Sequence, residues 1–177
     1  MSKVSESFSK LFGILNKNLK LLIGIIIFLV AVSIAYLAFK VITTPKGDDQ
    51  FSVTLTRGAC FGSCPVYMVS IDGKGIVNYK GNNFVKVKGE HIYVVDVNNA
   101  IKLRDYLRKE NFFSFKNRYE QNATDLPSFT LVVKDQGQTK QIYVYGSKQI
   151  DDTIPGVLFD MADAVDTAAE DKSFVVR

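Results

Sequence analysis

The two cysteines of the chain, Cys60 and Cys64, are separated by Phe61, Gly62 and Ser63. In an oxidising compartment so close a pair usually forms a disulfide, and a glycine inside the small ring can adopt the backbone angles that the ring demands. The sequence therefore predicts a structural Cys60–Cys64 disulfide. Loop entropy gives so short a ring only about 2 kcal/mol of stability, so we expect it mainly to shape its loop.

Two cysteines could also serve in redox chemistry or metal binding. Thiol oxidoreductases favour Cys-x-x-Cys at the start of a helix, and that pattern is absent, so redox chemistry is the weaker alternative. Two thiols leave a tetrahedral zinc site short of ligands. The single histidine, His91, lies far along the chain and is expected to be an ordinary strand side chain. We predict no metal site.

No catalytic arrangement stands out elsewhere in the sequence. Neither a Gly-x-Ser-x-Gly nucleophile elbow nor a phosphate-binding glycine loop occurs. Asp160, Asp163 and Asp166 recur at threefold spacing on the last expected helix, which indicates a solvated face, and Asp151 and Asp152 precede that helix where its dipole favours acids. We expect a protein without catalytic residues or a cofactor, and not an enzyme.

Residues 21–39 form an uncharged run of nineteen residues, thirteen of them Leu, Ile, Val or Phe, between Lys20 and Lys40. A helix of this length covers roughly 28 Å, close to the ~30 Å hydrocarbon core of a bilayer. The sequence predicts a transmembrane helix here. A cleaved signal peptide is the competing interpretation, although the apolar region of such peptides is usually only ~7–15 residues long.

The distribution of charge indicates the orientation of this helix and argues against a nucleic-acid partner. Residues 1–50 hold six lysines and three acids, which leaves 16 basic and 15 acidic residues of the chain's 22 and 18 for residues 51–177. Lysines are concentrated before the apolar run, so the N-terminus is expected in the cytoplasm, with residues 1–20 as a basic amphipathic leader. The nearly neutral remainder is not that of a phosphate-backbone binder.

After a linker at residues 40–50, residues 51–177 carry the patterns of one α+β domain. Alternating apolar residues and short turns predict six strands, and helical periodicity predicts one helix after Asp96 and another from Thr153. The expected strands are 51–56, 66–71, 76–79, 84–88, 128–134 and 140–145. This order predicts an antiparallel sheet of about six strands with two helices packed on one face.

Residues 57–67, Arg-Gly-Ala-Cys-Phe-Gly-Ser-Cys-Pro-Val-Tyr, resemble the signature of a bacterial family of exported domains of unknown function. The likeness continues through residues 71–81, 84–87, 112–113 and 124–127 and covers roughly residues 51–170. It implies an exported α+β domain and carries no catalytic assignment. Residues that match the pattern, including Cys60, Cys64, Tyr67 and Asp125, become candidates for loop architecture or ligand contact.

The sequence is compatible with three functions. The leading hypothesis is a single-pass accessory or scaffolding subunit, anchored in the bacterial inner membrane beside integral membrane proteins of a larger complex, with its domain in the periplasm. The alternative is a periplasmic module that binds a small molecule, a peptide or an envelope polymer, and a thiol-redox enzyme is the third. The possible binding loop comprises Arg57, Phe61, Gly62, Ser63, Tyr67 and Asp125, with residues 119–128 beside it.

Overall fold

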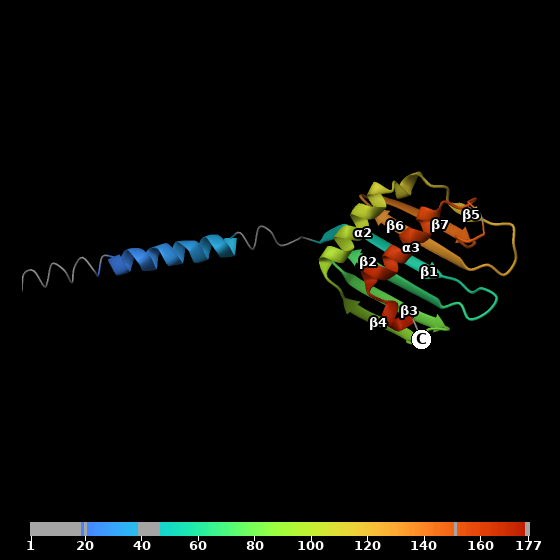
Figure 1. The fold of residues 1–177 in the computed structure, drawn as a ribbon, viewed down its shortest axis with the longest axis horizontal. Helices are drawn as coiled ribbons and strands as arrows, with labels where there is room; N and C mark the ends of the chain where they lie inside the picture. Colours follow the sequence, from blue (N-terminus) through green and yellow to red (C-terminus); the bar gives the residue numbers. More distant parts are fainter. Residues whose placement is uncertain (1–18, 20, 39–46, 151, 176–177) are drawn as a thin grey trace, which may run out of the picture. The chain divides into compact units, whose positions relative to one another are not determined.

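The computed structural model of the protein describes residues 19, 21–38, 47–150 and 152–175. The chain divides into two units, Met1–Thr44 and Pro45–Arg177. Figure 1 shows the succession of elements along the chain. Those of the second unit are β1 (Asp48–Arg57), β2 (Val66–Gly73), β3 (Ile76–Asn83), β4 (Gly89–Val94), α2 (Val97–Lys109), η1 (Phe112–Ser114), β5 (Arg118–Glu120), β6 (Ser128–Asp135), β7 (Gln138–Tyr145), α3 (Gly156–Ala169) and α4 (Lys172–Val175).

The first unit contains one helix, Leu21–Ala38, that is long and apolar enough to cross a membrane. None of its residues is buried within the protein. The apolar helix predicted from the sequence is confirmed, and its form suits either a membrane anchor or a signal sequence. Apart from Leu19, the predicted leader lies outside the described residues, as do Phe39 and residues 40–46 of the predicted linker.

Seven strands of the second unit form one sheet in the order β4-β3-β2-β1-β6-β7-β5. Five neighbouring pairs are antiparallel, and β5 pairs with β7 in parallel. The α+β class is confirmed, with one strand more than the six expected. The additional strand is β5, whose three residues are too few for an alternation of apolar and polar residues to be recognised in the sequence.

The fourth strand lies elsewhere than the sequence indicates. Residues 84–88 form a bend, and β4 follows at Gly89–Val94, paired with β3. Phe84 has a left-handed backbone (φ 56°), which takes the chain out of the sheet. Val85 is nevertheless buried and Val87 half-buried. The alternation of apolar residues therefore indicates which side chains face the core, but residues 84–88 do not pair with a neighbouring strand.

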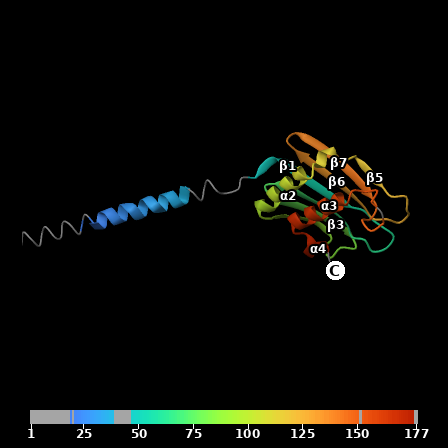
Figure 2. The same ribbon diagram turned by 45° about the horizontal axis from the view of Figure 1, so that its top comes forward.

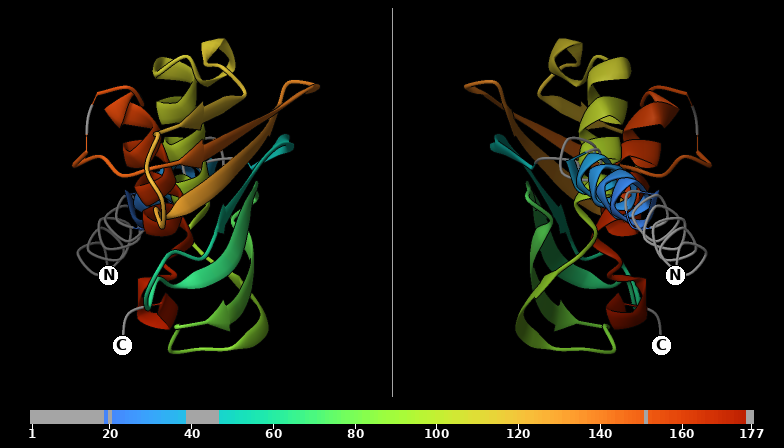
Figure 3. Two further views of the ribbon diagram at one scale, coloured as in Figure 1. Left: turned by 90° about the vertical axis from the view of Figure 1, so that its right-hand side faces the viewer. Right: turned by 90° about the vertical axis from the view of Figure 1, so that its left-hand side faces the viewer.

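The helices α2 and α3 pack against the sheet, and two short elements that were not predicted, η1 and α4, accompany them. Asp96 caps α2, its side chain accepting a hydrogen bond from the Asn98 N–H at 2.9 Å, and α3 begins after Pro155. Figures 2 and 3 show α2 and α3 side by side over the sheet. Among the described elements of the second unit, no helix covers the opposite face (Figure 3). The core therefore lies in a single layer between the sheet and the two helices.

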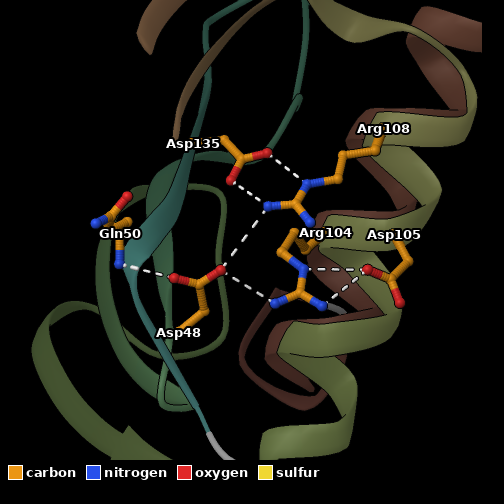
Figure 4. A network of polar contacts seen from close by, with 6 residues as sticks. All are labelled: Asp48, Gln50, Arg104, Asp105, Arg108 and Asp135. Atoms are coloured by element: carbon orange, nitrogen blue, oxygen red, sulfur yellow. Dashed lines mark hydrogen bonds and ion pairs between the residues drawn. The ribbon is translucent and has the colours of Figure 1, made fainter. Parts of the chain in front are cut away.

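A network of charged side chains ties α2 to the strands at the end of the sheet where β1 begins (Figure 4). Arg108 donates two hydrogen bonds of 2.7 Å to the carboxylate of Asp135, which is only 6% exposed. Arg104 donates to Asp48 at 3.1 Å. The main-chain N–H of Gln50, together with Arg104, lowers the pKa of Asp48. These contacts fix the first residues of β1 against α2.

We expect Arg108→Ala to lower the free energy of unfolding by about 2–4 kcal/mol, because it leaves the buried Asp135 carboxylate without its bidentate partner. Chemical denaturation of the full-length protein in detergent measures this. Lys109→Ala is the matched control, since the Lys109 side chain is 80% exposed, and a change within about 0.5 kcal/mol is expected. Equal changes in the free energy of unfolding for the two substitutions would show that the Arg108–Asp135 ion pair does not stabilise the fold.

Candidate functional site

The loops that join β1 to β2, β5 to β6 and β7 to α3 meet at one end of the sheet. Antiparallel pairing sets this arrangement, because Arg57 at the end of β1 lies opposite Phe129 near the start of β6, and Ser128 lies opposite Tyr145 at the end of β7. Asp48, where the chain enters β1, is at the other end of the same strand. The candidate site therefore lies at the end of the domain away from the point of chain entry.

The disulfide loop, residues 58–65, is built as predicted around its two cysteines. Cys60 and Cys64 lie at disulfide distance, with Cα atoms 5.7 Å apart. The Phe61 N–H donates to the carbonyl of Asp125 at 3.3 Å, which joins this loop to residues 121–127. Phe61 itself is 84% exposed at the tip, an unusual position for a large apolar side chain. The Phe61 side chain is therefore available for contact with a molecule that binds at this end of the domain.

Gln121 fastens the second loop to the third. Its buried side-chain amide accepts from the Ser147 N–H at 2.8 Å and donates to the Ser147 carbonyl at 3.1 Å. A Cβ on Gly146 would lie 2.5 Å from Ile154 and 2.6 Å from the Gln121 amide oxygen, so only glycine fits between them. The three loops are thus held together by main-chain and amide hydrogen bonds, which gives the surface between them a defined shape.

A cavity of about 310 Å³ opens between these loops and α3, and we call it the loop groove. Its walls come from all three loops, from β6 and from α3. They combine two prolines, two aromatic rings and several polar groups, the composition expected of a binding cleft. The lining residues are Arg57, Gly58, Cys64, Pro65, Pro127, Ser128, Phe129, Gly146, Ser147, Lys148, Gln149, Phe159 and Asp163.

A second cavity of about 440 Å³, the inner cavity, shares Arg57, Pro65 and Asp163 with the loop groove. The Arg57 guanidinium donates to Asp163 at 2.8 Å and to Asp166 at 2.6 and 3.1 Å, so it forms a wall common to both cavities. Tyr67, Asp166, Asp171, Lys172 and Val175 complete the inner cavity.

Two carboxyl groups of the inner cavity are buried and closely coupled. Asp166 is 8% exposed and Asp171 is fully buried, at 0%. Burial raises the pKa of Asp171 to about 7, and the neighbouring Asp166 charge adds to the rise. Burial also raises the pKa of Asp166, although the Arg57 charge opposes this. Perturbed acids in a cavity are typical of functional sites.

The predicted binding residues divide between two places. Arg57 lines both cavities and Tyr67 lines the inner cavity, whereas Phe61, Gly62 and Ser63 form the exposed loop tip. Asp125 takes part through its main chain, with a left-handed backbone (φ 63°). The expected pocket lined jointly by Phe61, Tyr67 and Asp125 does not form, because Tyr67 points into the core (3% exposed) and the other two side chains face solvent.

Sequence reasoning missed the acids of this site. Asp160 and Asp163 are exposed, as expected of a solvated helix face, but Asp166 on the same face is buried, so that interpretation is wrong for Asp166. Arg57 could have indicated a buried acid, because a basic side chain that is half-buried at the end of a strand needs a carboxylate partner. His91 is exposed on β4 and packs edge-on against Phe174, and among the described residues no cluster of acids, histidines and cysteines is arranged to hold a metal.

Together these features define an α+β domain with a disulfide-closed loop at one end of its sheet, preceded in the chain by a helix able to cross a membrane. The family described as "Domain of unknown function (DUF6438)" matches residues 51–169, and the chain belongs to that family. No curated protein matches the chain. The match includes the disulfide loop, Arg57 and Asp166, and it ends at the last residue of α3.

Substitution of Asp171 by Asn should flatten the dependence of stability on pH. Because the pKa of Asp171 is higher in the folded than in the unfolded state, its stabilising contribution is complete below about pH 4 and is lost as pH rises through about 7. Relative to Asp171→Asn, the wild type should lose about 2–4 kcal/mol between pH 4 and pH 8. Thermal unfolding followed by circular dichroism across this range measures the difference. Parallel pH profiles of stability for the wild type and Asp171→Asn would contradict a raised pKa for Asp171.

Proposed function

We propose that this protein is a single-pass, membrane-anchored extracytoplasmic module that binds a small molecule or a short peptide at the loop end of its domain. The observation that carries the proposal is the pair of cavities separated by Arg57. Their volumes, about 310 and 440 Å³, are those of ligand sites, and residues far apart in the sequence converge on them. Such a convergence of polar and apolar groups is more than a loop connection requires.

The proposed compartment is the periplasm of a bacterium, with the N-terminus in the cytoplasm and the apolar helix retained in the inner membrane. The lysines before the apolar run support this orientation. The cysteine pair at disulfide distance suits an oxidising compartment. In this setting the bridge holds the rim of the loop groove, where Cys64 lies, in one conformation. Preorganisation of this kind reduces the entropy lost on binding.

A photo-crosslinking amino acid at position 148 tests the proposal. Lys148 lines the loop groove and its side chain is 52% exposed, so replacement leaves the fold in place. In native membranes, irradiation should add a discrete mass to the polypeptide, measured by intact mass spectrometry. Lys134, exposed on β6 away from the groove, is the control position and should give no adduct of that mass. The same adduct at both positions, or none at position 148, would refute the proposal.

An accessory role in a larger membrane complex is the second candidate, and one surface favours it. On the uncovered face of the sheet, Ile92 and Val94 of β4 are 74% and 71% exposed, and Ile76 of β3 lies opposite Val94. These three residues form the outer-face patch. Soluble proteins usually keep apolar side chains on an edge strand covered. An exposed patch of this kind is therefore suited to contact with an integral membrane partner.

If the patch docks on a partner, the double substitution Ile92→Asp and Val94→Asp should abolish chemical cross-links to that partner in native membranes. The thermal midpoint should change by less than about 2 °C, because both side chains lie outside the core. Asn78→Asp, on the same face beside Ile92, is the control for added charge. Unchanged cross-linking of the double variant would eliminate this surface as the docking site.

A further inference from the structure

Strand β4 forms one edge of the sheet, and half of its main-chain groups point outward from that edge. In the order of the sheet its neighbour among the described strands is β3 (Figure 1). The Val95 N–H donates to the Gly75 carbonyl at 2.9 Å, so these two residues form a hydrogen-bonded pair across the ladder. Because such pairs alternate along an antiparallel ladder, residues 93, 91 and 89 also direct their N–H and C=O groups toward β3. Those of Glu90, Ile92 and Val94 therefore point away from the sheet.

The opposite edge of the sheet is protected against pairing, whereas the β4 edge is not. Strand β5, at the other end of the order, has only three residues, and Arg118 and Glu120 carry charge. Short strands and charged side chains are usual means of preventing edge-to-edge pairing. β4 has six residues, Gly-Glu-His-Ile-Tyr-Val, without proline or lysine, and they pair with β3 in unbroken register. Such an edge is a template for one more strand.

Contacts on the inner face hold β4 in place. The ring of Tyr93 packs 5.4 Å from that of Phe174 in α4, and the Tyr93 hydroxyl donates to the carbonyl of the last residue of α3 at 2.8 Å. The ring of His91 packs 5.7 Å from the same phenylalanine. On the other face, Ile92 and Val94 are 74% and 71% exposed. A strand fixed in this way loses little entropy when it binds a partner, because it is already ordered.

The sequence of β4 is complementary to itself in one antiparallel register. If Ile92 lies opposite Ile92 of a second copy, Glu90 lies opposite Val94, and Lys88 lies opposite Asp96 of that copy. The last two side chains are exposed, so this register brings opposite charges together at both ends. A shift of two residues in one direction sets Glu90 against Asp96, two like charges. The opposite shift sets Lys88 against Val94 and separates the apolar residues from one another.

We propose that β4 pairs with β4 of a second copy about a twofold axis at Ile92, which joins the two sheets into one. Each of the three outward residues then donates one main-chain hydrogen bond and accepts one. Ile76, Ile92 and Val94 of both copies form one apolar cluster, because cross-strand and diagonal neighbours lie within contact distance. The twofold axis closes the assembly at a dimer. A second copy, instead of an integral membrane partner, thus covers the outer-face patch.

Membrane anchoring would strengthen this small interface. Two copies held in one bilayer have a high effective concentration, so a short strand pairing suffices to keep them together. In this respect the dimer rests on the proposed function, whose anchor supplies the confinement. The dimer is independent of the proposed ligand site, because neither the loop groove nor the inner cavity is lined by residues of β4.

Cysteine cross-linking of the full-length protein in native membranes tests the register. On oxidation with copper phenanthroline, Ile92→Cys should give a disulfide-linked dimer on a non-reducing gel. The reason is that Cα atoms of a hydrogen-bonded pair are about 5.5 Å apart, within the range of a disulfide. Glu90→Cys and Val94→Cys should each give no dimer alone, because each lies four residues from its own copy in this register. Coexpressed with different tags, these two variants should give the mixed dimer.

A proline at position 92 separates main-chain pairing from side-chain docking. The Ile92 N–H points away from β3, so Ile92→Pro leaves the β3–β4 ladder intact and removes both central hydrogen bonds of the dimer. In detergent, Ile92→Pro should raise the dissociation constant of the dimer about tenfold or more, measured by analytical ultracentrifugation. Ile92→Val, which retains the N–H and most of the apolar surface, is the matched control and should change it less than about threefold.

A monomeric Ile92→Cys protein would overturn the dimer, and so would a cross-link to a different polypeptide, which would favour the integral membrane partner. Dimers of Glu90→Cys alone as abundant as those of Ile92→Cys would overturn the register. An unchanged dissociation constant in folded Ile92→Pro would overturn main-chain pairing, and if this variant does not fold, the pattern of cysteine cross-links decides. Each of these results leaves the ligand site standing, whereas absence of an adduct at position 148 refutes that site and leaves the dimer standing.

Discussion

The ion pair between Arg57 and Asp166 is the contact on which the loop end of the domain depends. It joins the last residue of β1 to the C-terminal half of α3, across 109 positions of sequence, with N···O distances of 2.6 and 3.1 Å. Removing either partner would leave the other charge partly buried and unpaired. The free-energy cost of that unpaired charge is larger than the stabilisation that the intact pair contributes. The same guanidinium reaches Asp163 and so separates the two cavities.

This pair lies at the end of β1 opposite the point where the chain enters the domain. The chain enters the domain at Asp48, and the ten residues of β1 carry it roughly 30 Å to Arg57. The opposite end of the sheet is fixed by a separate charge network in which Arg108 and Asp135 fasten α2. An ion pair thus lies near each end of β1: Arg108–Asp135 beside its start, and Arg57–Asp166 at its end among the loops.

Much of the fold could be predicted from sequence because the signals are local. The apolar helix, the cap at Asp96 and the cysteine pair each follow from a few neighbouring residues. The strand predicted at residues 84–88 was wrong because alternation reports burial and does not reveal the left-handed backbone at Phe84. The acids of the site were missed for a related reason. Whether Asp166 faces solvent depends on Arg57, a hundred residues earlier, and periodicity along one helix contains no information about that partner.

The most direct test of the account is a carbon-13 NMR titration of the Asp171 carboxyl in the full-length protein in detergent micelles. We predict a midpoint near pH 7, because the group is buried beside Asp166. A midpoint near 4, the value of an ordinary exposed aspartate, would contradict the burial of this carboxyl group beside Asp166.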